Sequence, residues 1–139
     1  MTNEKNTVCL ALEKQQATCA VLKNGNLFFS KEHGIKPLLN WLEEPDFFRD
    51  ATVADRIIGR AAALLLTYGG IRELYAQVIS EHAARALEEH HIPFSYGKKV
   101  PYIINRTNTG MCPMEQKVLQ ISDPADAYQI LKATIHSPK

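Results

Sequence analysis

Apolar and polar residues follow two different periods along this chain, and the change of period separates the expected helices from the expected strands. Residues 3–14 place three apolar residues on one side of a short amphipathic helix. Asn24-Gly25 lies between two runs of β-forming residues, and both residues tolerate the positive φ angles of a type I′ turn. We therefore expect a hairpin with strands near 17–22 and 26–30.

The longest helical pattern in the sequence covers residues 53–68. Thr52 is a good N-cap residue, and Asp55 stands three positions later, in a weaker relative of the capping box. Gly69-Gly70 ends the pattern, because glycine adopts the left-handed conformation that a C-cap favours. The apolar face of the expected helix consists of Ala54, Ile57, Ile58, Ala61, Ala62, Leu65 and Tyr68.

The second half of the chain alternates between expected strands and helices. Residues 71–79 alternate with period two, which predicts a strand, and Ser80 is expected to cap a helix at 81–91. Such alternation favours right-handed crossovers and parallel neighbours. We therefore expect one three-layer α/β/α domain over residues 1–139, with a mixed sheet of four or five strands. The other expected elements are a helix from Pro37 to about residue 43, extended segments at 92–97 and 100–104, a short helix from Pro113, and a last helix from Pro124 to about residue 135.

The charge balance narrows the classes of partner. Lys and Arg number 16 and Asp and Glu number 15, so the formal net charge is +1. This balance provides no basic surface for nucleic acid or for an anionic membrane. The three cysteines cannot all pair within one chain, and no apolar run is long enough for a signal core or a membrane span. We expect a cytoplasmic protein with reduced thiols and with neither nucleic acid nor a membrane as a partner.

Four segments resemble a bacterial family of unknown function with a cytidine deaminase-like fold. They are GIKPLL, VADRIIGRAAALLL, VISEHAARAL and VPYIINRTNTGMCPMEQKV, in this order within residues 17–120. The second segment lies where zinc deaminases carry H-A-E or C-A-E at the start of a long helix. The third lies where they carry P-C-x-x-C at the start of the next helix. The resemblance implies this fold and no assigned reaction.

The zinc ligands of the deaminases are missing at the matching positions. Val53 occupies the first ligand position, and Glu81 and Ala84 fall where two cysteines belong. Only the acid survives, as Asp55. A zinc deaminase needs three thiolate or imidazole ligands to generate its hydroxide. The resemblance therefore implies no metal and no other cofactor, and standard zinc-dependent deamination is not expected.

Four candidate site residues lie at the two expected helix starts: Asp55, Arg56, Ser80 and Glu81. They have a structural interpretation, because acids and serine at helix starts satisfy free N–H groups and the helix dipole. They also have a functional one, because ligands bind in the crevice outside the carboxyl ends of strands in an open α/β sheet. Asp55 would then bind ligand hydroxyl groups or act as a base, and Arg56 would face an anionic group.

Residues 105–115, NRTNTGMCPME, form the most chemically distinctive stretch. Asn105 and Arg106 supply donors on an expected loop, where binding groups often occur. Cys112 is expected at the N-cap of the next helix, with Glu115 at position N3. A thiol at a helix start is either a reactive group, because backbone dipoles favour its thiolate, or a small buried cap. The other two cysteines, Cys9 and Cys19, lie among apolar neighbours and are expected in the core.

The favoured hypothesis is a domain that binds a small nucleotide-like molecule in the ancestral deaminase pocket. The preference for a nucleotide-like ligand follows from the resemblance alone. The alternatives are a thiol-dependent enzyme that uses Cys112, and a non-catalytic interaction module. The apolar stripe of the last helix could pack on its own sheet or on a second subunit in a homodimer. The residues expected to bind the ligand are Asp55, Arg56, Ser80, Glu81, Asn105, Arg106, Cys112 and Glu115, with Asp55 and Cys112 as the catalytic candidates.

Overall fold

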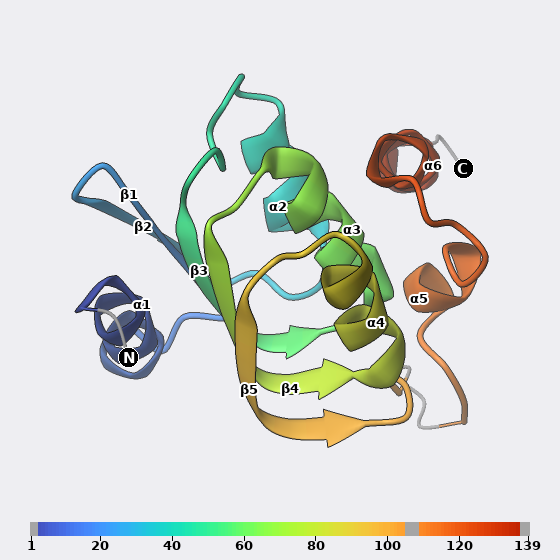
Figure 1. Cartoon of the computed structure of the whole chain (residues 1–139), viewed down its shortest axis with the longest axis horizontal. Coiled ribbons are helices and arrows are strands. Elements are labelled where there is room, and N and C mark those ends of the chain that lie inside the picture. Colours follow the sequence, from blue (N-terminus) through green and yellow to red (C-terminus); the bar gives the residue numbers. More distant parts are fainter. Residues whose placement is uncertain (1–2, 105–108, 137–139) are drawn as a thin grey trace.

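The computed structural model describes residues 3–104 and 109–136, and it places one five-stranded sheet at the centre of the chain (Figure 1). The strand order is β2-β1-β3-β4-β5. Strand β1 is antiparallel to both of its neighbours, and β3, β4 and β5 are parallel. The expected mixed sheet is confirmed. The strands are β1 (Cys19–Lys23), β2 (Asn26–Ser30), β3 (Thr52–Ile58), β4 (Glu73–Ser80) and β5 (Phe94–Val100).

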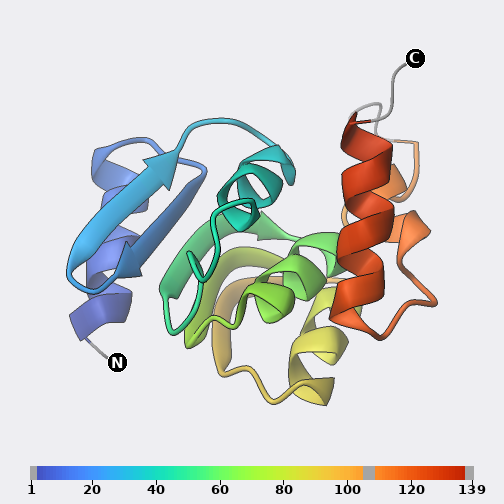
Figure 2. The ribbon, with the colours of Figure 1, turned by 90° about the horizontal axis from the view of Figure 1, so that it is seen from above.

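Helices cover both faces of the sheet (Figure 2). On one face, α1 packs its apolar side against Ala20, Leu22 and Ala54. On the other face, α3 and its neighbouring helices enclose the larger core, which includes Val21 and Val53. The helices are α1 (Asn3–Lys14), α2 (Lys36–Leu42), α3 (Arg60–Gly69), α4 (Glu81–Glu89), α5 (Pro113–Lys117) and α6 (Pro124–His136). None of them, within the described residues, has the length and apolar character to cross a membrane.

The hairpin β1–β2 forms where the sequence predicts it. Asn24 and Gly25 have φ angles of 50° and 79°, so both residues of the turn lie in the left-handed region. The pairing Lys23↔Asn26 closes the hairpin directly at this turn.

The expected helix 53–68 is wrong in its first part, because residues 52–58 form strand β3 and helix α3 begins only at Arg60. Gly59 is the N-cap residue, with extended φ and ψ angles. Residues 51–54 are all buried, since β3 lies between two other strands and under helices on both faces. A strand buried on both faces is apolar without interruption, and over this short length its pattern also fits a helical face. Thr52 and Asp55 therefore lie on a strand and do not cap a helix.

The last third of the chain differs from expectation in one element. A single strand, β5, covers residues 94–100, and the second extended segment contributes only an isolated bridge between Ile104 and Met111. The short helix from Pro113 and the last helix from Pro124 are both present.

Candidate functional site

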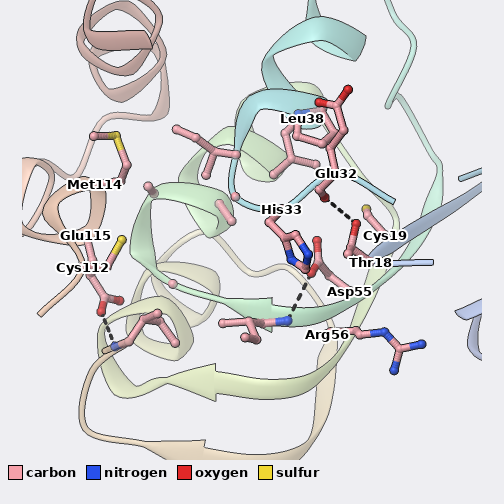
Figure 3. Close-up of a pocket in the computed structure, with 18 of the residues that line it drawn as sticks. Thr18, Cys19, Glu32, His33, Leu38, Asp55, Arg56, Cys112, Met114 and Glu115 are labelled. Carbon is pink, nitrogen blue, oxygen red and sulfur yellow. Dashed lines mark hydrogen bonds between the residues drawn. The ribbon is translucent and has the colours of Figure 1, made fainter. Parts of the chain in front are cut away.

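A pocket of about 330 Å³ lies on the α3 side of the sheet, where β3 ends and α3 begins (Figure 3). Its walls come from β3, from the segment before α2, from α2 and α3, and from the region of α5. Apolar side chains make most of the surface. The residues used below are Thr18, Cys19, Glu32, His33, Leu38, Asp55, Arg56, Ile57, Ala62, Cys112, Met114 and Glu115.

Strand alternation turns the Asp55 side chain toward this pocket. Successive residues of a strand point to opposite faces, so Asp55 shares a face with Val53 of the larger core. Cys19 on β1 is paired with Asp55 in the sheet register, and its thiol donates a hydrogen bond to the carboxyl group. The backbone N–H of Ile57 donates a second hydrogen bond to Oδ1 at 3.1 Å. Asp55 is thus a partly buried carboxyl group in the pocket wall, and these hydrogen bonds fix its position.

Burial raises the pKa of Asp55 from its usual 3.8 to about 7. Hydrogen bonds from Ile57, Cys19 and Arg56 and the positive charge of Arg56 oppose this change without cancelling it. Burial also raises the pKa of Cys19 well above its usual value, and the neighbouring Asp55 adds to the increase. Near neutral pH the pocket therefore contains a carboxyl group that can exist in either protonation state, beside a neutral thiol.

The prediction that Arg56 binds a ligand conflicts with the position of its guanidinium group. Arg56 follows Asp55 on β3 and points to the opposite face of the sheet, toward α1. Its Nε and Nη2 donate to the carbonyl oxygens of Ala17 and Leu12, each at 2.7 Å, and Nη1 donates to Gln77 at 3.3 Å. The side chain fastens the end of α1 to the sheet.

Glu115 connects the starts of two helices. It is 1% exposed, and its Oε2 accepts the backbone N–H of Arg60 at 2.8 Å and the hydroxyl hydrogen of Ser80. Its Oε1 accepts the backbone N–H of Ile103 at 2.7 Å. Arg60 begins α3, and Ser80 is the N-cap of α4. This one carboxylate therefore joins α5 to both helix starts and to the segment after β5.

Ser80 and Glu81 do not line the pocket. The Ser80 oxygen accepts the backbone N–H of Ala83 at 3.0 Å, as an N-cap does, and its hydrogen goes to Glu115. Glu81 is exposed on α4. The structural interpretation accounts for the contacts of Ser80, and the binding of a ligand by these two residues stays a prediction.

Cys112 lines the pocket opposite Asp55 (Figure 3). It is half-buried at the N-cap of α5, where its side chain makes no capping hydrogen bond. Asn105 and Arg106 lie outside the described residues, so their part in binding stays a prediction. Cys19, expected in the core, is buried there and also contributes to the pocket wall.

Sequence reasoning missed the segment between β2 and α2, and Thr18 just before β1. Glu32 and His33 of that segment line the pocket together with Thr18. Figure 3 shows the His33 ring and the Asp55 carboxyl group turned toward the same region. The Thr18 hydroxyl lies within hydrogen-bond distance of the Ser30 and Glu32 carbonyl oxygens, which places this segment beside the pocket. No local motif marks these residues, because only the folded segment brings them to Asp55.

Within residues 3–104 and 109–136, no group of three His, Cys, Asp or Glu side chains has the arrangement of a metal site. The carboxylate of Glu115 is committed to three donors of the chain itself.

Comparison with known proteins places the chain in a family. The model of the TM1506 family, a domain of unknown function (DUF1893), matches residues 7–135. The chain belongs to the DUF1893 family. Among solved structures, this DUF1893 chain is similar to the crystal structure of a DUF1893 family protein (TM1506) from Thermotoga maritima, with 28% identity and a TM-score of 0.89. The similarity covers 96% of this chain and 91% of that one. The comparison with curated proteins finds no match.

Proposed function

We propose that this DUF1893 domain binds a small nucleotide-like molecule in the pocket between β3, α2, α3 and α5. The observation that carries the proposal is the carboxyl group of Asp55, which is fixed in the wall of an otherwise mostly apolar pocket. Small-molecule sites usually combine apolar walls with a few fixed polar groups, and the volume of 330 Å³ is at the lower end of their range of about 300–1,000 Å³.

The position of the pocket supports the proposal. It lies at the carboxyl end of β3, beside the antiparallel strand β1, and ligands of open α/β sheets bind outside the carboxyl ends of strands. Leu38 and Ala62 supply apolar surface, and Asp55 supplies hydrogen-bonding capacity on one side. A flat ring with a polar edge suits this combination.

We also propose that the fold is deaminase-like but has lost the zinc chemistry. The order β2-β1-β3-β4-β5, with a helix directly after β3 and another directly after β4, supports this relationship. The resemblance places the zinc ligands at Val53, Glu81 and Ala84, and the structure has Val53 inside β3 and the other two residues in the first turn of α4. Valine and alanine side chains are not zinc ligands, which argues for binding without deamination.

The test is a ligand screen with a variant that fills the pocket. Ile57 lines the pocket with 55% of its surface exposed, so Ile57→Trp adds bulk to the pocket without disturbing the core. Leu10 on α1 is 54% exposed and does not line this pocket, so Leu10→Trp is the matched control. Nucleosides, nucleotides and ADP-ribose-type compounds are screened by thermal shift.

A binding compound should raise the melting temperature of the parent and of the Leu10→Trp variant, because binding to the native state alone stabilises it by mass action. The Ile57→Trp variant should show a much smaller rise. If no compound in the panel stabilises the parent at millimolar concentration, the proposal is wrong. Equal stabilisation of all three proteins would place the binding site elsewhere.

A further inference from the structure

The charged groups around the pocket are unevenly distributed. Asp55 lies in the wall, Glu32 lies on the segment before α2, and Glu115 lies on α5. Among the described lining residues, the groups that can carry positive charge are Arg56 and His33, and the His33 ring is turned toward the same region as the carboxyl group of Asp55, which competes with a phosphate for that charge. Which charges can reach a ligand decides which ligands the pocket accepts.

Arg56 cannot serve as a counter-ion for a ligand in the pocket. Its guanidinium group lies on the α1 face of the sheet, and all three of its nitrogens donate to Leu12, Ala17 and Gln77. Turning it toward the pocket would break these three hydrogen bonds and would require the side chain to cross the sheet. Its charge therefore remains on the far face.

The helix start at the pocket is already occupied by a negative charge. The N-terminus of a helix is a common site for phosphate, because its N–H groups and its dipole attract anions. At α3, the carboxylate of Glu115 accepts the N–H of Arg60 at 2.8 Å. The same carboxylate takes the N–H of Ile103 at 2.7 Å. A phosphate at this place would meet a buried carboxylate and would find these two donors taken.

Asp55 offers the opposite chemistry. Its internal donors are the N–H groups of Ile57 and Arg56 and the thiol of Cys19, and a carboxylate has about four acceptor sites, so one is left for a ligand. A carboxyl group in an apolar wall attracts N–H donors strongly, because the hydrogen bond forms away from water. Glu32 adds a second negative charge on the lining.

Building on the proposed function, we infer that the pocket takes an unphosphorylated, base-like molecule that presents an N–H donor to Asp55, and that it discriminates against phosphate-bearing nucleotides. The class is a nucleoside or a free base with an amino edge. The inference rests on the charges of the described residues and on the hydrogen bonds that Arg56 and Glu115 already make within the chain.

The experiment compares matched ligands on the intact protein by titration calorimetry. Purine riboside lacks the amino group of adenosine, and adenosine 5′-monophosphate carries a phosphate that adenosine lacks, so each differs from adenosine by a single group. We expect adenosine to bind about tenfold or more tightly than purine riboside, since purine riboside lacks the amino group that donates to Asp55. We expect the monophosphate to bind at least tenfold more weakly than adenosine. The same comparison is made with the cytidine and guanosine pairs of nucleoside and monophosphate.

The variant Asp55→Val removes the acceptor while keeping a strand-forming residue, and Glu44→Gln on the exposed turn after α2 is the control. The preference for adenosine over purine riboside should disappear in Asp55→Val and persist in Glu44→Gln. If Asp55→Val does not fold, the ligand pairs on the parent protein still decide the question.

The possible failures can be told apart. A monophosphate that binds as tightly as its nucleoside, or more tightly, overturns this inference and leaves the proposed function in place. Equal affinity for adenosine and purine riboside overturns the role given to Asp55. Absence of binding by every nucleoside and every nucleotide overturns the proposed function itself.

Discussion

Asp55 and Glu115 are two carboxyl groups of one chain with different surroundings. Glu115 is buried and accepts hydrogen bonds from Arg60, Ser80 and Ile103. Asp55 is partly buried and faces a pocket with mostly apolar walls. The first arrangement stabilises the fold, whereas the second keeps a carboxyl group available near neutral pH.

The raised pKa of Asp55 predicts a specific pH dependence of stability. Because its folded-state pKa of about 7 exceeds the unfolded value of 3.8, the native chain retains a proton that the unfolded chain releases. Stability is then lost as the pH rises through this interval. Between pH 5 and 8 the parent should lose about 2 kcal/mol of unfolding free energy relative to Asp55→Asn, at up to 1.36 kcal/mol per pH unit. Urea denaturation at several pH values measures this difference, and parallel profiles for the two proteins would contradict it.

Glu115→Gln should destabilise the protein. The amide keeps the size of the side chain but replaces an acceptor with a donor, so that one of the three partners of Glu115 is left without an acceptor in a buried place. We expect a loss of about 2–4 kcal/mol in chemical denaturation. Glu44→Gln on the exposed surface should change stability by less than about 0.5 kcal/mol. A similar small effect for Glu115→Gln would show that these hydrogen bonds contribute little.

At the scale of elements, local signals predict the structure well where they are sufficient by themselves. The Asn24-Gly25 turn and the proline-led helix α5 appear where the sequence predicts them. Strand β3 was predicted as a helix, because a strand that is buried on both faces and one face of a helix have the same apolar pattern over seven residues. That error moved Asp55 from a strand to a helix start, whereas the structure has Asp55 on β3 in the wall of the pocket.

The parts of the candidate site that carry a local signal in the sequence could be predicted, and the parts that depend on distant residues could not. Cys112 and Asp55 stand out by residue type and reach one pocket. The role of Glu115 depends on Ser80 and Arg60, which are 35 and 55 residues away in sequence, and no local pattern contains that information. The sequence also offers no sign that Arg56 points away from its neighbour Asp55 until residue 55 is known to lie on a strand.

The close packing at the end of α3 can be tested by substitution of Gly69, the last residue of this helix. A Cβ atom added at Gly69 would lie 2.7 Å from Cβ of Phe48, which is shorter than any normal contact. Gly69→Ala should therefore destabilise the protein by about 1–3 kcal/mol despite its better helix propensity. At Gly110, no atom of the described residues lies within 4 Å of such a Cβ, so Gly110→Ala is the control and should be near neutral. Thermal denaturation compares the two, and equal stabilities would contradict the packing at Gly69.

At the scale of the whole molecule, the sheet separates two environments. The α1 face contains Arg56 and Cys9, and the α3 face contains the pocket with Asp55 and Cys112. The shared fold with the Thermotoga maritima protein extends over both faces, since the similarity covers 96% of this chain. The two partly exposed cysteines, Cys9 and Cys112, therefore report on opposite faces of the sheet.

This separation predicts selective protection of one thiol. A ligand in the pocket should slow alkylation of Cys112 by iodoacetamide severalfold and leave the rate at Cys9 unchanged, because Cys112 lines that pocket and Cys9 lies on the α1 side of the sheet. Cys19 is buried and should react last. Peptide mass spectrometry after timed alkylation measures all three rates in one sample. Equal slowing of Cys9 and Cys112 would indicate general stabilisation and would argue against binding at this pocket.

The hydrogen bonds of Glu115 also bear on the order in which the molecule assembles during synthesis. The starts of α3 and α4 leave the ribosome well before residue 115, and until then the N–H of Arg60 and the hydroxyl of Ser80 lack this partner. Met114 and Cys112, which form one wall of the pocket, arrive at the same late stage. The sheet core can therefore collapse first, whereas the pocket is completed only when the last quarter of the chain docks. A nascent chain stalled before α5 should contain the hairpin and β3 but bind no ligand.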